Sequence, residues 1–158
     1  MAANYVPKID REKKTILIVG SGGVGKTSFI NRVSNKPFDR RYNPTIGTNK
    51  SAPIIFNQYE LNILDSSGQE FWNEIPKYDG IDGAIVMFDI HSSLSYRAIP
   101  DYIRNIRETQ GQIPIVICGN KLDVTTTIRK IPKNDRVYLE ISSKSSINYD
   151  KIFEKLFK

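Results

Sequence analysis

The sequence predicts an α/β fold with a mostly parallel sheet of about six strands, one antiparallel edge strand and helices on both faces. Two observations support this prediction. Short runs rich in β-branched residues alternate with segments of helical spacing, which is typical of repeated strand–helix–strand units. Some of these runs are apolar throughout, as expected for strands that are covered on both faces of a sheet.

The expected elements follow one another along the whole chain. The strand pattern occurs at residues 15–20, 52–56, 61–65, 83–89, 113–119 and 137–142. Helical spacing occurs at residues 26–34, 94–108 and 148–157. Only the segment NQYE separates the second strand from the third, so a hairpin joins them and these two strands are antiparallel.

Length and composition indicate one domain that can bury a core without disulfides. The chain has 158 residues, of which 39% are hydrophobic and 25% are charged. We expect residues 1–14 to form an N-terminal extension and residues 15–158 to form a single domain. Cys118 lies in an apolar run and is expected in the core, whereas His91 is the sole histidine, which excludes a histidine-rich metal site.

The charge balance and hydropathy limit the kinds of partner and the cellular locations that we expect. The 23 basic and 17 acidic residues give a net charge of +6, and the basic residues are spread along the chain. We therefore expect a solvated basic surface and no direct binding of nucleic acid. No apolar run approaches the roughly 18 residues of a membrane span, and the N-terminus is too polar for a secretory signal. The expected location is the cytoplasm and/or the nucleus, and the expected state is a monomer.

A glycine-rich segment joins the first expected strand to the first expected helix. Gly20, Gly25, Lys26 and Thr27 spell the pattern G-x-x-x-x-G-K-T. Glycine lets backbone N–H groups approach oxygen atoms closely, and a helix N-terminus favours negative charge, so a triphosphate fits. Lys26 would neutralise the β- and γ-phosphate oxygens, and the Thr27 hydroxyl would bind Mg²⁺. The residues expected to surround the phosphates are Ser21, Gly22, Gly23, Val24, Gly25, Lys26, Thr27 and Ser28.

The segment NKLD, residues 120–123, predicts which base is bound. It follows the expected strand 113–119, at the carboxyl edge where ligands of open α/β sheets bind. The Asp123 carboxylate can accept hydrogen bonds from the ring N–H and the exocyclic amine of guanine, whereas adenine offers an acceptor at its ring nitrogen. The site should therefore select guanine, with Asn120 as a further binding residue.

Two more strand ends carry polar segments. DSSG, residues 65–68, matches D-x-x-G, with Asp65 near Mg²⁺ and the Gly68 N–H directed at the γ-phosphate. ISSK, residues 141–144, would present backbone N–H groups to the guanine carbonyl, through Ser142, Ser143 and Lys144.

With these motifs the chain resembles the Ras superfamily of small GTPases over nearly its whole length, and within it most resembles the Ran family. The segments that carry the Ran likeness are IPIVICGNKLD, GAIVMFDI followed by SYRAIPDYIRNI, and EISSKSSINYDKIFEKLF. The resemblance implies the P-loop small GTPase fold, GTP or GDP and Mg²⁺ as ligands, and hydrolysis of GTP.

The resemblance also implies roles for individual residues. Thr45 corresponds to the switch I threonine that contacts Mg²⁺ and the γ-phosphate, and Phe38 to the aromatic residue that packs on guanine. Gln69 corresponds to the glutamine that orients the attacking water, so Gln69, Lys26 and Thr45 are the expected catalytic residues. Lys121 would lay its alkyl stem along the base.

The chain departs from the family pattern in several places. It is about two residues short after Gln69, and Pro76 should interrupt a helix there, so switch II is expected to be remodelled. At least one of Phe71, Trp72 and Ile75 should pack on the sheet. The segment between Asp123 and Ser142 is short, so the fourth helix is expected to be reduced. The sequence ends without an acidic tail or a terminal cysteine, so no lipid anchor is expected.

Three functions remain open at this point. The first is a switch that hydrolyses GTP slowly and depends on an activating protein, an exchange factor and an importin-β-type effector, which the Ran resemblance implies. The second is a GTP-binding interaction module with little hydrolysis. The third is another P-loop enzyme such as a nucleotide kinase. NKLD argues against the kinase because it specifies guanine, and Gln69 favours the first function over the second.

Overall fold

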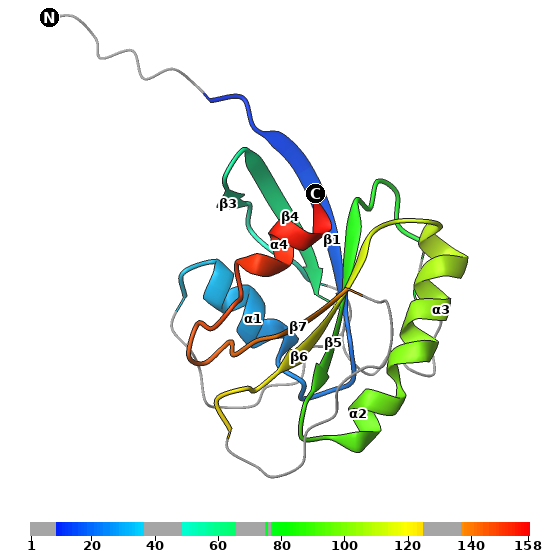
Figure 1. Ribbon diagram of the computed structural model, residues 1–158. Coiled ribbons are helices and arrows are strands. Elements are labelled where there is room, and N and C mark those ends of the chain that lie inside the picture. Colours follow the sequence, from blue (N-terminus) through cyan, green and yellow to red (C-terminus); the bar gives the residue numbers. More distant parts are fainter. Residues whose placement is uncertain (1–8, 37–48, 66–74, 76, 125–136) are drawn as a thin grey trace, which may run out of the picture.

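The structure is a computed structural model that describes residues 9–36, 49–65, 75, 77–124 and 137–158 (Figure 1). The described strands form one sheet in the order β2-β4-β1-β5-β6-β7, and β3 also pairs with β4. The strands are β1 Glu12–Val19, β2 Asn49–Lys50, β3 Ile54–Phe56, β4 Tyr59–Asp65, β5 Gly83–Asp89, β6 Ile115–Asn120 and β7 Tyr138–Glu140. The helices are α1 Lys26–Val33, α2 Ser93–Arg97, α3 Ile99–Gln110 and α4 Lys151–Leu156. The predicted α/β class is confirmed.

Helices cover both faces of the sheet, and each face has its own core. In Figure 1, α1 and α4 lie on one side of the sheet, and α2 and α3 lie on the other. Ile16 and Ile18 of β1 belong to the core cluster that contains residues of α1 and α4, whereas Leu17 and Val19 belong to the cluster that contains residues of α3. Because neighbouring strand residues point to opposite faces, a strand segment buried on both sides is apolar throughout, as residues 16–19 of β1 are.

The pairing of the strands confirms a mostly parallel sheet with an antiparallel edge. The pairs β1–β4, β1–β5, β5–β6 and β6–β7 are parallel. At the edge, β2 and β3 both run antiparallel to β4, and the predicted hairpin joins β3 to β4 through a turn in which Asn57 has a φ of 51°.

The expected strand at 52–56 is shorter in the structure, where β3 begins at Ile54 and the short strand β2 precedes it. Its register against β4 shifts by one residue between Lys50, which faces Leu64, and Ile54, which faces Leu61. This shift is a bulge, and it coincides with Pro53, whose nitrogen cannot donate to the ladder. Ser51 bridges the gap, because its side-chain oxygen accepts a hydrogen bond of 2.9 Å from the Ile63 N–H.

The prediction of a single helix over 94–108 is wrong, because the structure contains α2 and α3 in its place. Pro100 lies in the first turn of α3, where its missing N–H breaks the helical ladder behind it. Ser92 caps α2 by accepting a hydrogen bond from the Ser95 N–H. The last helix begins at Lys151 and not at Asn148, whose φ of 56° is incompatible with a helix.

The boundaries of the first and last strands differ slightly from the expected ones. Some other expectations concern residues that the structure does not describe. The first strand starts at Glu12, three residues earlier than expected, and the last covers Tyr138–Glu140 only. Residues 66–74, 76 and 125–136 lie outside the described residues, and with them the expectations for switch II and the fourth helix. Ile75 is buried in the core cluster that contains α3, so at least one of the three apolar residues after Gln69 packs on the sheet, as predicted.

Three further observations concern the rest of the described chain. Cys118 is fully buried, as predicted, and burial raises the pKa of its thiol well above the usual value. His91 lies in the turn after β5. Among the described helices, none combines the length and apolar character that crossing a membrane requires.

Candidate nucleotide-binding site

The glycine-rich loop between β1 and α1 packs directly against two neighbouring strand ends. A side chain at Gly20 would place its Cβ 2.2 Å from the Met87 carbonyl oxygen of β5. A side chain at Gly25 would place its Cβ 2.3 Å from the Asn120 side-chain nitrogen, and Gly25 has a φ of 101°. Only glycine fits these two positions without displacing a neighbour. The loop therefore lies in close contact with the sheet, at the carboxyl ends of its strands.

Lys26 is the first residue of α1, and its ammonium points back into this loop. Its Nζ donates to the Gly20 carbonyl oxygen at 2.8 Å and to the Ser21 carbonyl oxygen at 3.2 Å. The residue is buried, with 6% of its surface exposed. A buried ammonium gains strongly from a negative partner, so the loop has the charge that a phosphate group requires.

Thr27 and Asp65 form the next part of the site. The Thr27 hydroxyl donates to Asp65 Oδ2 at 2.6 Å, although the two residues come from α1 and from the end of β4. Asp65 is buried, and its second oxygen, Oδ1, has no hydrogen-bond partner among the described residues. Burial raises the pKa of Asp65 above its ordinary value, while the Thr27 hydrogen bond and the charge of Lys26 act in the opposite direction.

These residues fit a magnesium ion. Mg²⁺ prefers hard oxygen ligands, and it is commonly held by one or two carboxylates or hydroxyls together with phosphate oxygens. The Asp65 Oδ1 atom is a buried carboxylate oxygen that lacks a donor among the described residues, and the Thr27 hydroxyl lies beside the same carboxylate. A cation bound here would satisfy an oxygen that burial otherwise leaves unpaired.

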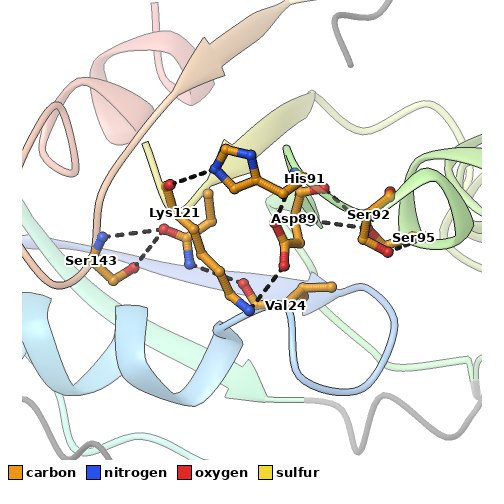
Figure 2. Close-up of polar contacts among 8 residues, drawn as sticks. Val24, Asp89, His91, Ser92, Ser95, Lys121 and Ser143 are labelled. Atoms are coloured by element: carbon orange, nitrogen blue, oxygen red, sulfur yellow. Dashed lines mark hydrogen bonds and ion pairs between the residues drawn. The ribbon is translucent and has the colours of Figure 1, made fainter. Parts of the chain in front are cut away.

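Asn120, at the end of β6, connects the phosphate loop to the loop after β7. Its side-chain nitrogen donates to the Val24 carbonyl oxygen at 2.9 Å, and its side-chain oxygen accepts from the backbone N–H of Ser143 at 3.2 Å and from the Ser143 hydroxyl at 3.3 Å (Figure 2). Asn120 is buried. The sequence predicts this asparagine as a binding residue, but its part in joining two loops could be seen only in the structure.

Asp123 and Ser142 form the part of the site expected to read the base. The Ser142 hydroxyl donates to Asp123 Oδ1 at 2.5 Å and accepts from the Ser145 N–H at 3.0 Å. Ser142 is fully buried, so its hydroxyl holds the Asp123 carboxylate in a fixed position. Two of the N–H groups expected to face the base are used within the protein: that of Ser142 donates to the Ile147 carbonyl oxygen at 3.1 Å, and that of Ser143 donates to Asn120 Oδ1 at 3.2 Å.

Lys121 is held by the turn after β5, which the sequence analysis did not identify. Its ammonium forms an ion pair with Asp89 Oδ2 at 3.0 Å, and its carbonyl oxygen contacts His91 Nε2 at 3.2 Å (Figure 2). Asp89 also accepts from the His91 N–H at 2.9 Å. The sequence contained a signal for this contact, because Asp89 is the last residue of the expected strand 83–89, and in the structure it lies beside Asn120 in the parallel register.

The structure thus gathers most of the predicted site along one edge of the sheet. Lys26, Thr27 and Asp65 lie at one end, and Asn120, Asp123 and Ser142 lie at the other, joined through Val24. This is the edge at which open α/β sheets bind ligands. The predicted residues Phe38, Thr45, Gly68 and Gln69 lie outside the described residues.

The comparison with protein families agrees with this arrangement. The model described as Ras family matches residues 15–158, which is nearly the whole chain. The matched range contains both ends of the site.

Proposed function

The chain belongs to the Ras family of small GTPases, and we propose that it is a Ran-like switch that hydrolyses GTP with Mg²⁺. Family membership implies binding of GTP and GDP, GTPase activity and interaction with regulatory proteins in general. The observation that supports Mg²⁺ binding is the Thr27–Asp65 pair, in which one carboxylate oxygen has no hydrogen-bond partner among the described residues, at the same sheet edge as Asn120.

The proposed mechanism assigns a task to each group at this edge. Lys26 neutralises phosphate oxygens, and Thr27 and Asp65, with Thr45, hold Mg²⁺, which supplies positive charge against the phosphates when bound. Asp123 accepts hydrogen bonds from guanine, while Lys121 lies along the base. Gln69 orients the attacking water. No arginine is assigned as an internal catalytic residue, so intrinsic hydrolysis should be slow and an activating protein would raise the rate by about 10³ to 10⁵.

The Ran likeness supports a proposal about partners. We propose an exchange factor and an importin-β-type effector, with action in the cytoplasm and/or the nucleus and a link to nucleocytoplasmic transport. The support is the similarity of the segments around NKLD, GAIVMFDI and EISSK to the Ran family. Trp72 is proposed to respond to the γ-phosphate and to contribute to the effector surface.

A second function has a specific observation in its favour. The segment after Gln69 is short and contains Pro76, so the catalytic glutamine could be held differently from that of other family members. A GTP-binding interaction module with little hydrolysis would result. The two functions differ in turnover and agree in nucleotide affinity.

The test combines binding and turnover on the purified protein. We expect Mg²⁺-dependent competition by GTP and GDP and none by ATP at similar concentration. Single-turnover hydrolysis should be slower than about 1 s⁻¹ and slower still in Gln69→Leu. Comparable affinity for ATP would contradict the proposal. Tight GTP binding with no measurable hydrolysis, in the wild type and in Gln69→Leu alike, would favour the interaction module.

A further inference from the structure

Arg32 connects the last turn of α1 to the loop that follows β7. Its Nε donates to the Ser143 carbonyl oxygen at 2.9 Å, and its Nη2 donates to the Lys144 carbonyl oxygen at 2.8 Å. The two carbonyls belong to consecutive residues, so one guanidinium holds two adjacent peptide groups. Charge-assisted hydrogen bonds of this kind are stronger than neutral ones, and the planar guanidinium fixes the directions of both acceptors.

These contacts determine where the loop's N–H groups point. In a trans peptide the C=O of one residue is antiparallel to the N–H of the next, and no cis peptide occurs in the described chain. Since the Ser143 and Lys144 carbonyls face Arg32, the N–H groups of Lys144 and Ser145 face the opposite side.

The Ser145 N–H shows what lies on that opposite side. It donates to the Ser142 hydroxyl, which in turn donates to Asp123. The side away from Arg32 is therefore the side of Asp123, where the base is proposed to bind. The Ser143 N–H is already used by Asn120. The Lys144 N–H is thus the group of this loop that Arg32 directs toward the base position.

We propose that Arg32 is a positioning residue for guanine, which holds the loop so that the Lys144 N–H donates to the O6 atom of the base. This inference rests on the proposed binding of GTP and GDP. Arg32 does not contact the nucleotide. It lies on the helix that begins with Lys26, so α1 supports the site at the phosphates with its first turn and at the base with its last.

The test is a cycle that changes the protein at Arg32 and the ligand at O6. The ligands are GDP, 6-thio-GDP, in which sulfur is a weaker acceptor than O6, and IDP, which keeps O6 and lacks the exocyclic amine. In Arg32→Ala we expect GDP to dissociate about tenfold faster, since a loop hydrogen bond is lost. The preference for GDP over 6-thio-GDP should shrink several-fold, while the preference for GDP over IDP stays constant, because the amine faces Asp123.

Arg107 provides a matched control. It also lies in the last turn of a helix and donates to two backbone carbonyls, of Ile113 at 2.6 Å and of Gly111 at 3.3 Å. It belongs to α3, on the other face of the sheet (Figure 1). Arg107→Ala should leave all three affinities unchanged, although it removes a similar clamp and lowers the melting temperature.

The outcomes separate positioning from a purely structural role. If Arg32→Ala weakens GDP, 6-thio-GDP and IDP by the same factor, or changes none of them, the inference is overturned. If Arg32→Ala does not fold, Arg32→Lys replaces it: a lysine keeps the charge but lacks the planar fork, so the GDP preference over 6-thio-GDP should still fall. A wild-type protein that binds no GDP would instead contradict the proposed function itself.

Discussion

The two ends of the nucleotide site are stabilised in different ways. At the phosphate end, a buried ammonium rests on carbonyl oxygens and a buried carboxylate keeps one oxygen without a partner among the described residues. At the base end, the Asn120 side chain donates to the Val24 carbonyl oxygen and accepts from Ser143, and the Ser142 hydroxyl donates to Asp123. One end carries two buried charges, of which the carboxylate has one oxygen without a hydrogen-bond partner among the described residues, whereas the buried polar side chains at the other end are hydrogen-bonded.

This difference indicates which end depends on the ligand for its stability. A buried polar group without a partner costs about 1 to 3 kcal/mol, and a charged one costs more. A cation bound together with the nucleotide phosphates would relieve that cost at Asp65 Oδ1. The buried side chains of Asn120, Ser142 and Ser143 at the base end need no such relief, because they already have hydrogen-bond partners. We therefore expect the base end to be preformed and the phosphate end to be completed by nucleotide.

The largest expected effect comes from the place where the two ends meet. In Gly25→Ala, the new Cβ collides with the Asn120 side chain, which joins the phosphate loop to Ser143, and the φ of 101° adds strain. Both ends are disturbed together, so GDP affinity should fall about a hundredfold or more, as measured by fluorescence titration. Gly111→Ala is the matched control, because its φ is 77° but its Cβ would meet nothing within 4 Å. Equal GDP affinity in Gly25→Ala and wild type would contradict this view of the junction.

A smaller effect is expected at the base end alone. Asp123→Asn places an amide donor where the guanine amine points, so GTP affinity should fall at least about tenfold. Xanthine carries a carbonyl at that carbon, so the variant should prefer XTP, as measured by competition. Asp101→Asn, which removes a carboxylate paired with Arg104 on α3, should change neither affinity. A folded Asp123→Asn variant that still prefers GTP would show that Asp123 does not read the base.

The smallest effect concerns the phosphate end without ligand. The pKa of Asp65 is raised in the folded state, so between its unfolded and folded pKa the folded protein binds more protons than the unfolded one. The free energy of unfolding therefore falls as pH rises through that interval and stays lower above it. Asp65→Asn removes the buried charge and should raise the stability of the nucleotide-free protein at neutral pH by about 1 kcal/mol.

Thermal melts without nucleotide between pH 4 and pH 8 would measure this gain, which should vanish at the acid end. The same variant should lose the Mg²⁺ dependence of its GDP affinity. The Asp101→Asn variant again serves as control, since that carboxylate is at the surface. A lower melting temperature for Asp65→Asn than for the wild type at neutral pH would show that the carboxylate stabilises the ligand-free fold.

The class of fold and the position of the site could both be predicted from the amino-acid sequence. The second half of β1, residues 16–19, is apolar because it is buried on both faces, and a glycine-rich loop that opens a helix has a local geometry suited to phosphate. These properties depend on residues that are close together in the sequence, so they can be predicted from the sequence alone. The placement of Lys26 and Asp123 at strand ends on one sheet edge followed from the alternation of strands and helices.

Tertiary structure decided how the residues of the site hold one another. Arg32 and Ser143 are far apart in the sequence, as are Val24 and Asn120, and their hydrogen bonds depend on the order of the strands and on the packing of α1. The bulge near Pro53 likewise depends on the register against β4. A hydrogen bond needs its two atoms within about 3 Å of each other, and a sequence pattern does not define distances between remote segments to that accuracy.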